Sequence, residues 1–136
     1  MKIIAAVIGM GVGKKHLEAI DGYMGSTVKI ICEKNKKKIQ ILKKKYPNKI
    51  VTSKEEDIFQ DKQINLVSLA SYDDYHYSQI QKCFRYNKNV IVEKPMCLNP
   101  NQLKNIYKLI KTKKIKMTSN LVLRVKIPKH TKLLLP

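Results

Sequence analysis

The chain has 136 residues, of which 28 are basic and 10 acidic, giving a formal net charge of +18, and 43% of its residues are hydrophobic. This length supports one domain, and no apolar run approaches the length of a membrane span. The charge raises nucleic acid as a partner, but every basic residue except Arg85 and Arg124 is a lysine. Lysine often only solvates a helix surface, so a solvated surface is favoured over a nucleic-acid interface.

Three cysteines, Cys32, Cys83 and Cys97, are odd in number and form no C-x-x-C pair. Neither a disulfide framework nor a zinc site is indicated, and we expect no bound metal. Unpaired thiols fit a reducing compartment, so the expected location is the cytoplasm.

Short apolar runs, rich in Val and Ile and without strict polar alternation, predict strands buried on both faces. In chain order they cover residues 2–8, 27–32, 49–52, 64–70, 89–92 and 115–123. Helical patterns lie between them, at residues 14–23, 35–46, 55–59, from 73 or 74 to about 86, and onward from 99. Asp73 or Asp74 is expected to cap the fourth helix, and Asn99-Pro100 to start the fifth. This alternation predicts a doubly wound α/β fold with a parallel sheet.

The first strand ends in "IGMGVGKKH", which has glycines at positions 9, 11 and 13. Glycines allow positive backbone angles and let the main chain approach a ligand closely. Amides at the start of the next helix, with its dipole, then favour an anion such as a pyrophosphate. The turn from Gly9 through Met10, Gly11 and Val12 to Gly13 is therefore a candidate cofactor site, although a tight strand–helix joint would also use glycines.

Glu33 follows about twenty residues later, at the end of the second strand, where a dinucleotide fold places an acid on the adenosine ribose. Its charge would repel a 2′-phosphate and favours NAD. Lys34 comes next, and three more lysines follow at positions 36, 37 and 38. Because a lysine there could bind that phosphate, NADP stays open.

The fourth strand ends at Ser71 and Tyr72, and His76 lies early in the following helix. In a sheet of order 3-2-1-4-5-6, ligands bind where the strand order reverses, between strands one and four. We expect Ser71 and Tyr72 to line the nicotinamide half of this crevice, with His76 near it. A structural role for His76 is the alternative.

"NVIVEKPMCLNP" places Glu93, Lys94 and Pro95 directly after the fifth strand. Strand five neighbours strand four in this order, so Lys94 is expected to emerge beside the nicotinamide site. Pro95 fixes one of its own dihedral angles and restricts Lys94 to extended conformations. Lys94 is the candidate catalytic residue, and Glu93 a neighbour at the cofactor.

Taken together, "IGMGVGKKH", Glu33, "SLASYDDYHY", "VIVEKPMCLN" and "TSNLVLR" resemble the nucleotide-binding half of the Gfo/Idh/MocA oxidoreductases, the glucose–fructose oxidoreductase and inositol dehydrogenase family. The resemblance runs from about Lys2 to Arg124. It implies a Rossmann fold that binds NAD or NADP, and hydride transfer to or from sugars, cyclitols or nucleotide sugars. It also implies that Lys94 binds substrate and handles its proton, and that the Lys94–Pro95 peptide bond is cis.

Two features depart from the family pattern. The third glycine comes one residue earlier than in G-x-G-x-x-G, and the chain ends just past "NLVLR", where a larger substrate domain would begin. We therefore expect a dinucleotide-binding domain at residues 1–124, an irregular tail at 125–136, and no normal turnover by this chain alone. A non-catalytic dinucleotide-binding module that works with a partner chain is an alternative, and a basic nucleic-acid binder is another. Full-length relatives are expected to form homo-oligomers, and the oligomeric state of this chain stays open.

Overall fold

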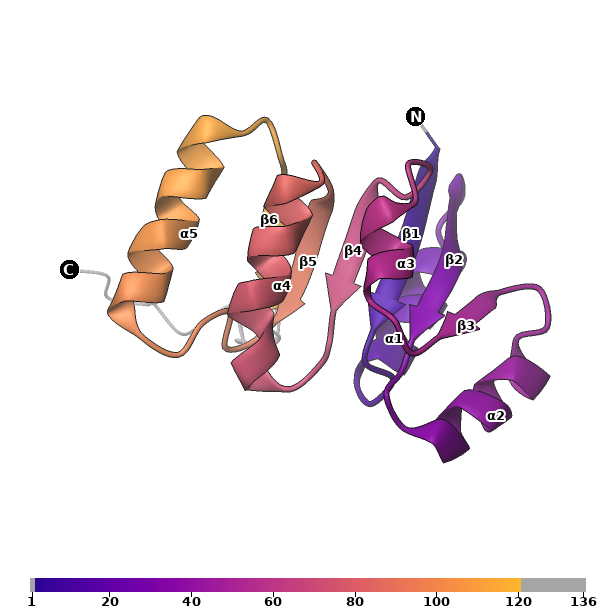
Figure 1. Ribbon diagram of the computed structural model, residues 1–136. Coiled ribbons are helices and arrows are strands. Elements are labelled where there is room, and N and C mark those ends of the chain that lie inside the picture. Colours follow the sequence, from indigo (N-terminus) through magenta and orange to yellow (C-terminus); the bar gives the residue numbers. More distant parts are fainter. Residues whose placement is uncertain (1, 121–136) are drawn as a thin grey trace, which may run out of the picture.

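The computed structural model describes residues 2–120, which form one six-stranded sheet with helices on both faces (Figure 1). The strands are β1 (Ile3–Ile8), β2 (Ser26–Cys32), β3 (Ile50–Thr52), β4 (Leu66–Leu69), β5 (Asn89–Glu93) and β6 (Met117–Asn120). The helices are α1 (Gly13–Asp21), α2 (Lys36–Lys45), α3 (Glu56–Gln60), α4 (Asp73–Arg85) and α5 (Pro100–Thr112). Every predicted element is present, and the boundaries differ from the predictions by a few residues.

All strand pairs are parallel, and their order is β3-β2-β1-β4-β5-β6. The predicted doubly wound α/β fold is confirmed. The order reverses at β1, which pairs with β2 on one side and β4 on the other. The chains leaving β1 and β4 therefore diverge at the carboxyl edge of the sheet, and a crevice opens between them.

Successive residues of β1 face opposite sides of the sheet and enter separate hydrophobic clusters. Ala5 and Val7 join Leu17 and Ile20 of α1, while Ala6 and Ile8 join the cluster of α3, α4 and α5. Figure 1 shows α3, α4 and α5 in front of the sheet and α1 behind it. Burial on both faces explains why the strands read as continuous apolar runs.

Two helices begin at the residues expected from the sequence, and a third has a different N-cap residue. Asn35 and Asn99 accept hydrogen bonds from the amides of Lys38 and Gln102, and thereby begin α2 and α5. The expected cap at Asp73 or Asp74 is wrong, because α4 starts one residue earlier, with Tyr72 at the N-cap position and no side-chain cap. Both aspartates lie in the first turn instead, where their charge still suits the helix dipole.

The end of the sixth predicted strand, residues 121–123, Arg124 and the expected tail at 125–136 lie outside the described residues. Within residues 2–120, no helix is both long and apolar enough to cross a membrane.

Candidate functional site

The candidate residues from four separate strands gather at the carboxyl edge of the sheet. Ile8 is in register with Cys32 on one side and Leu69 on the other, and Leu69 is in register with Val92. The residues that follow these positions therefore form one row along the edge. This convergence was predicted from the strand order.

The three glycines of the turn have different reasons to be glycine. Gly9 has a φ of +85°, and a β-carbon there would lie 2.4 Å from the carbonyl oxygen of Ala70. A β-carbon on Gly13 would lie 2.9 Å from Cγ1 of Val7, whereas one on Gly11 would meet nothing within 4 Å. Packing therefore requires Gly9 and Gly13, while Gly11 faces open space where a ligand can approach the backbone.

Several amides of this turn point away from the protein's own acceptors. Gly9 donates to the carbonyl of Cys32 at 2.9 Å, and Met10 donates to Oε2 of Glu33 at 3.2 Å. Within residues 2–120, the amides that follow have no hydrogen-bond acceptor until Lys15. They belong to Gly11, Val12, Gly13 and Lys14. With the amino end of α1 they form a row of donors suited to an anion.

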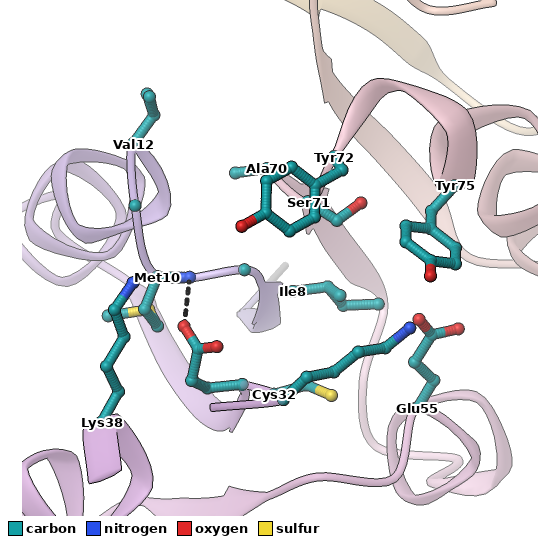
Figure 2. Close-up of a pocket in the computed structure, with 14 residues that line it drawn as sticks. Ile8, Met10, Val12, Cys32, Lys38, Glu55, Ala70, Ser71, Tyr72 and Tyr75 are labelled. Atoms are coloured by element: carbon teal, nitrogen blue, oxygen red, sulfur yellow. Dashed lines mark hydrogen bonds between the residues drawn. The ribbon is translucent and has the colours of Figure 1, made fainter. Parts of the chain in front are cut away.

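A cleft of about 250 Å³ opens beside the turn. Figure 2 shows Met10 and Val12 on one side and Tyr72 and Tyr75 on the other, with Cys32 between them. Cys32 is buried, and burial, with a smaller contribution from the charge of Glu55, raises its thiol pKa to about 12. Cys32 is therefore an uncharged thiol at neutral pH.

Glu33 lines the cleft and is held by the backbone of two loops. Its Oε2 accepts from Met10, the dashed line of Figure 2, and its Oε1 accepts from the amide of Asn35 at 2.9 Å. An ionised carboxylate has about four acceptor sites, so two remain for ligand hydroxyls. The expected acid is thus held beside the turn.

Two cations share the cleft with this acid. Lys38 lines its wall, and Lys34 crosses to α4, where its Nζ lies 3.8 Å from the centre of the Tyr75 ring. Figure 2 shows Lys38 and Tyr75 at opposite ends of the cleft. The cleft therefore carries the negative charge of Glu33 beside the positive charges of Lys34 and Lys38.

Ser71 also lines the cleft, and a buried network fixes its hydroxyl. It donates to Oε1 of Gln79 at 2.6 Å, and the Gln79 amide donates to Glu55 at 2.7 Å. Glu55 also accepts from Lys82 at 3.1 Å. Because a carboxylate only accepts, the donors run from Ser71 to Gln79 and from Gln79 and Lys82 to Glu55, and the Ser71 oxygen keeps its lone pairs for a ligand.

Lys94 lies at the same edge but outside the residues that line this cleft. Its side chain is exposed, and the Lys94–Pro95 bond is cis, as the resemblance implied. Lys94 and the glycine turn therefore lie at the same edge of the sheet, two strands apart, and Lys94 does not line the cleft beside the turn.

His76 is fully buried beneath this edge and does not line the cleft. Its Nδ1 lies 2.8 Å from the carbonyl oxygen of Pro95, and its Nε2 lies 3.2 Å from that of Ser71. The ring joins the end of β4 to the segment after β5, which is the structural alternative noted for it.

A second histidine, His16, was missed by the sequence analysis. Its Nδ1 lies 2.6 Å from the hydroxyl of Ser68, and its Nε2 lies 2.7 Å from Oε1 of Glu93. Asn120 also donates to Glu93, at 2.6 Å. Ser68 is a polar residue within a buried strand, and a buried hydroxyl needs a hydrogen-bond partner. It was the one feature of the sequence that could have indicated a polar partner such as His16.

Glu93 is committed to this network. Burial raises its pKa, but the hydrogen bonds from Asn120 and His16 and the charge of His16 outweigh burial, so the pKa lies below its ordinary value. Only 11% of its side chain is exposed. Glu93 therefore supports the edge from within, while Lys94 faces solvent.

Comparisons with known proteins show the family and the fold of the chain. A family described as an oxidoreductase family with an NAD-binding Rossmann fold, GFO_IDH_MocA, matches residues 3–121. An uncharacterized oxidoreductase of Escherichia coli K12, YdgJ, is 26% identical over 112 residues, which are 81% of this chain and 32% of that protein. The chain thus spans about a third of that relative's length.

Solved structures share the fold. The scyllo-inositol dehydrogenase of Lactobacillus casei, solved with NAD(H) and scyllo-inositol, has a TM-score of 0.83 and 21% identity, covering 92% of this chain and 38% of that one. The myo-inositol 2-dehydrogenase of Lactobacillus plantarum has a TM-score of 0.82 and 20% identity, with the same two coverages. At these identities the likeness concerns the fold alone.

Proposed function

This chain belongs to the Gfo/Idh/MocA family of oxidoreductases with an NAD-binding Rossmann fold, and we propose that it serves hydride transfer between the nicotinamide cofactor and a hydroxyl-bearing carbon of a sugar or cyclitol. The chain carries the cofactor-binding domain of that family. Its own residues supply the binding of the dinucleotide and one lysine at the reacting end.

One observation carries this proposal. The four consecutive amides of residues 11–14 have no acceptor within residues 2–120. They lie at the start of α1, beside a cleft that Glu33 also lines. Amides at a helix start bind the pyrophosphate, and an acid at the end of β2 binds the adenosine ribose. Both features of a dinucleotide site occur within one cleft.

The position of Glu33 indicates which half of the cofactor lies where. Ser71, Tyr72 and Tyr75 share the cleft with Glu33, so we place the adenosine half there. Ser71 and Tyr72 then contact adenosine rather than the nicotinamide half, where the sequence analysis put them. The nicotinamide half extends along the edge toward β5 and Lys94.

The balance between Glu33 and its neighbouring lysines favours NAD. Glu33 is fixed by two backbone amides, whereas Lys34 is placed over the Tyr75 ring. A fixed carboxylate repels a 2′-phosphate, while a lysine must leave its contact to neutralise one. We therefore expect NADH to bind more tightly than NADPH.

The substrate class rests on the reacting end and on the named neighbours. The inositol dehydrogenases that share this fold act, by their names, on cyclitols. When bound, the cofactor supplies the hydride acceptor or donor. Lys94, exposed at the edge and without an ion-pair partner in residues 2–120, would hydrogen-bond the substrate hydroxyl, and only its neutral amine form would take the hydroxyl proton as the hydride leaves.

Titration of the chain with NADH, followed by fluorescence or calorimetry, tests the binding step. Saturable binding at sub-millimolar NADH is expected, with Gly11→Ala weakening it. Lys43→Met, in the last turn of α2 and outside the cleft, is the control and should leave NADH binding nearly unchanged. The absence of any binding signal would refute the proposal.

A further inference from the structure

We propose that His16 and His76 are positioning residues that hold Lys94 from the two faces of the sheet. The inference rests on the proposed function, in which Lys94 meets the substrate. His16 holds the residue before Lys94, and His76 holds the residue after it. Neither histidine lines the cleft beside the glycine turn.

The hydrogen bonds around His16 have one consistent direction. The Glu93 carboxylate can only accept, so the Nε2–H of His16 and the amide of Asn120 both donate to it. In a neutral ring Nδ1 then accepts from the hydroxyl of Ser68, which is completely buried, and in a protonated ring Nδ1–H donates to that hydroxyl; Glu93 accepts in both forms. Within residues 2–120 no buried side-chain polar atom is left without a partner, so this network is fully satisfied.

The network joins four elements across the sheet. His16 comes from α1, Ser68 from β4 and Glu93 from the end of β5. Asn120 of β6 is the register partner of Glu93. A connected network built on two buried members, Ser68 and Glu93, favours one arrangement of its members, so the end of β5 is held at Glu93, the residue before Lys94.

His76 acts from the opposite side of the same segment. It lies on α4, which packs in the cluster on the other face of the sheet from α1. Its contacts are the carbonyl oxygens of Pro95 and Ser71. Both histidines thus join residues 93–95 to β4 and the loop that follows it. His16 does so through Ser68 of β4, and His76 through Ser71 just after it.

His16 also links this segment to the glycine turn. It stands three residues after Gly13, in the first turn of the helix whose amino end carries the free amides. A ligand that fixes those amides acts on the same helical turn that holds Glu93. A lysine that must meet a reacting atom requires such support from packed residues around it.

Amide hydrogen exchange at Val92 and Glu93, the last two residues of β5 within the sheet, tests this role in the ligand-free chain. His16→Leu should raise exchange of these amides about tenfold relative to the core of β1 and β4. The reason is that the hydrogen bond between His16 and Glu93 no longer opposes local opening at the end of β5. His16→Gln, which can donate to Glu93 and accept from Ser68, should restore the protection. Lys15→Leu, on the exposed side of the same helix, is the matched control and should change nothing.

Asn120→Ala removes the second donor to Glu93 at the end of β6 and gives a smaller rise at the same amides. It keeps the test valid if His16→Leu fails to fold. Equal exchange at Val92 and Glu93 in the wild-type protein and a folded variant would overturn the inference, as would a rise that His16→Gln does not reverse. NADH binding, measured separately, tests the proposed function and does not enter this outcome.

Discussion

At the glycine turn the groups that face the ligand belong to the backbone, whereas at Lys94 a side chain faces solvent and other side chains hold it. The turn depends on two glycines that packing requires and a third that leaves room. The Lys94 segment depends on buried His76, half-buried His16 and buried Glu93. The difference teaches that a binding site made of amides is determined locally, while a positioned lysine needs contacts from helices and strands far along the chain.

The glycines provide the largest test of the first half of this comparison. Gly9→Ala should destabilise the fold by about 3 kcal/mol or more, because the positive φ and the contact with Ala70 both oppose a β-carbon. Gly11→Ala should leave the melting temperature nearly unchanged. It should still weaken NADH binding about tenfold or more, since its methyl group would occupy the approach to the amides. Thermal unfolding and NADH titration measure the two effects, and equal melting temperatures for both variants would contradict the assignment.

These glycines also show how much the sequence could predict. The spacing of Gly9, Gly11 and Gly13 after an apolar run, with Glu33 at the end of the next strand, depends on a short stretch of chain. Local patterns of this kind correctly predicted the strands, the helices and the order of the sheet. They did not say which glycine faces the ligand, because that depends on Ala70 and Val7 across the turn.

The Lys94 end was less predictable for a physical reason. His16 lies 77 positions before Glu93, and Asn120 lies 27 after it, so no local pattern connects them. His76 could be placed near the edge from its strand, but not its two carbonyl partners. Ser71 and Tyr72 were expected near the nicotinamide, and their shared cleft with Glu33 appears only once the side chains are packed.

Glu33 gives the next largest expected effect. Glu33→Gln should raise the dissociation constant for NADH about 10- to 100-fold, because hydrogen bonds to a charged acceptor contribute about 1.5–3 kcal/mol. The dissociation constant for NADPH should change less, because Glu33→Gln removes the repulsion of the 2′-phosphate at the same time as it weakens the hydrogen bonds to the ribose. Titrations with both cofactors measure the ratio. An unchanged ratio would mean that Glu33 does not meet the ribose.

The pH dependence of stability tests the second half of the comparison. The pKa of Glu93 is lowered from its ordinary value of 4.5, so its hydrogen bonds stabilise the fold above pH 4.5 and are lost as pH falls through the lower folded value. Urea unfolding of Glu93→Gln should therefore show a weaker decline in stability below pH 4.5 than the wild-type protein. Glu18→Gln, an exposed acid on α1, is the control and should keep the wild-type profile. A Glu93→Gln profile parallel to that of the wild-type protein would contradict the network.

The thiols provide the smallest expected effect. Burial raises the pKa of Cys32 to about 12 and raises that of Cys83 as well, while Cys97 is partly exposed. At pH 8 a thiol reagent should modify Cys97 in the native protein, and the other two thiols only after unfolding. Rapid reaction of Cys32 in the folded state would mean that the bottom of the cleft is open to solvent.

The central claim is that the amides of the glycine turn and the carboxylate of Glu33 hold one dinucleotide. Amide chemical shifts recorded during NADH titration test it residue by residue. The expected result is that the signals of Gly11, Val12, Gly13 and Glu33 move together with one dissociation constant, while those of Lys43, Lys44 and Lys45 at the far end of α2 stay in place. Shifts confined to the lysines of α2, with the turn unchanged, would contradict the claim and indicate a charge-driven contact instead.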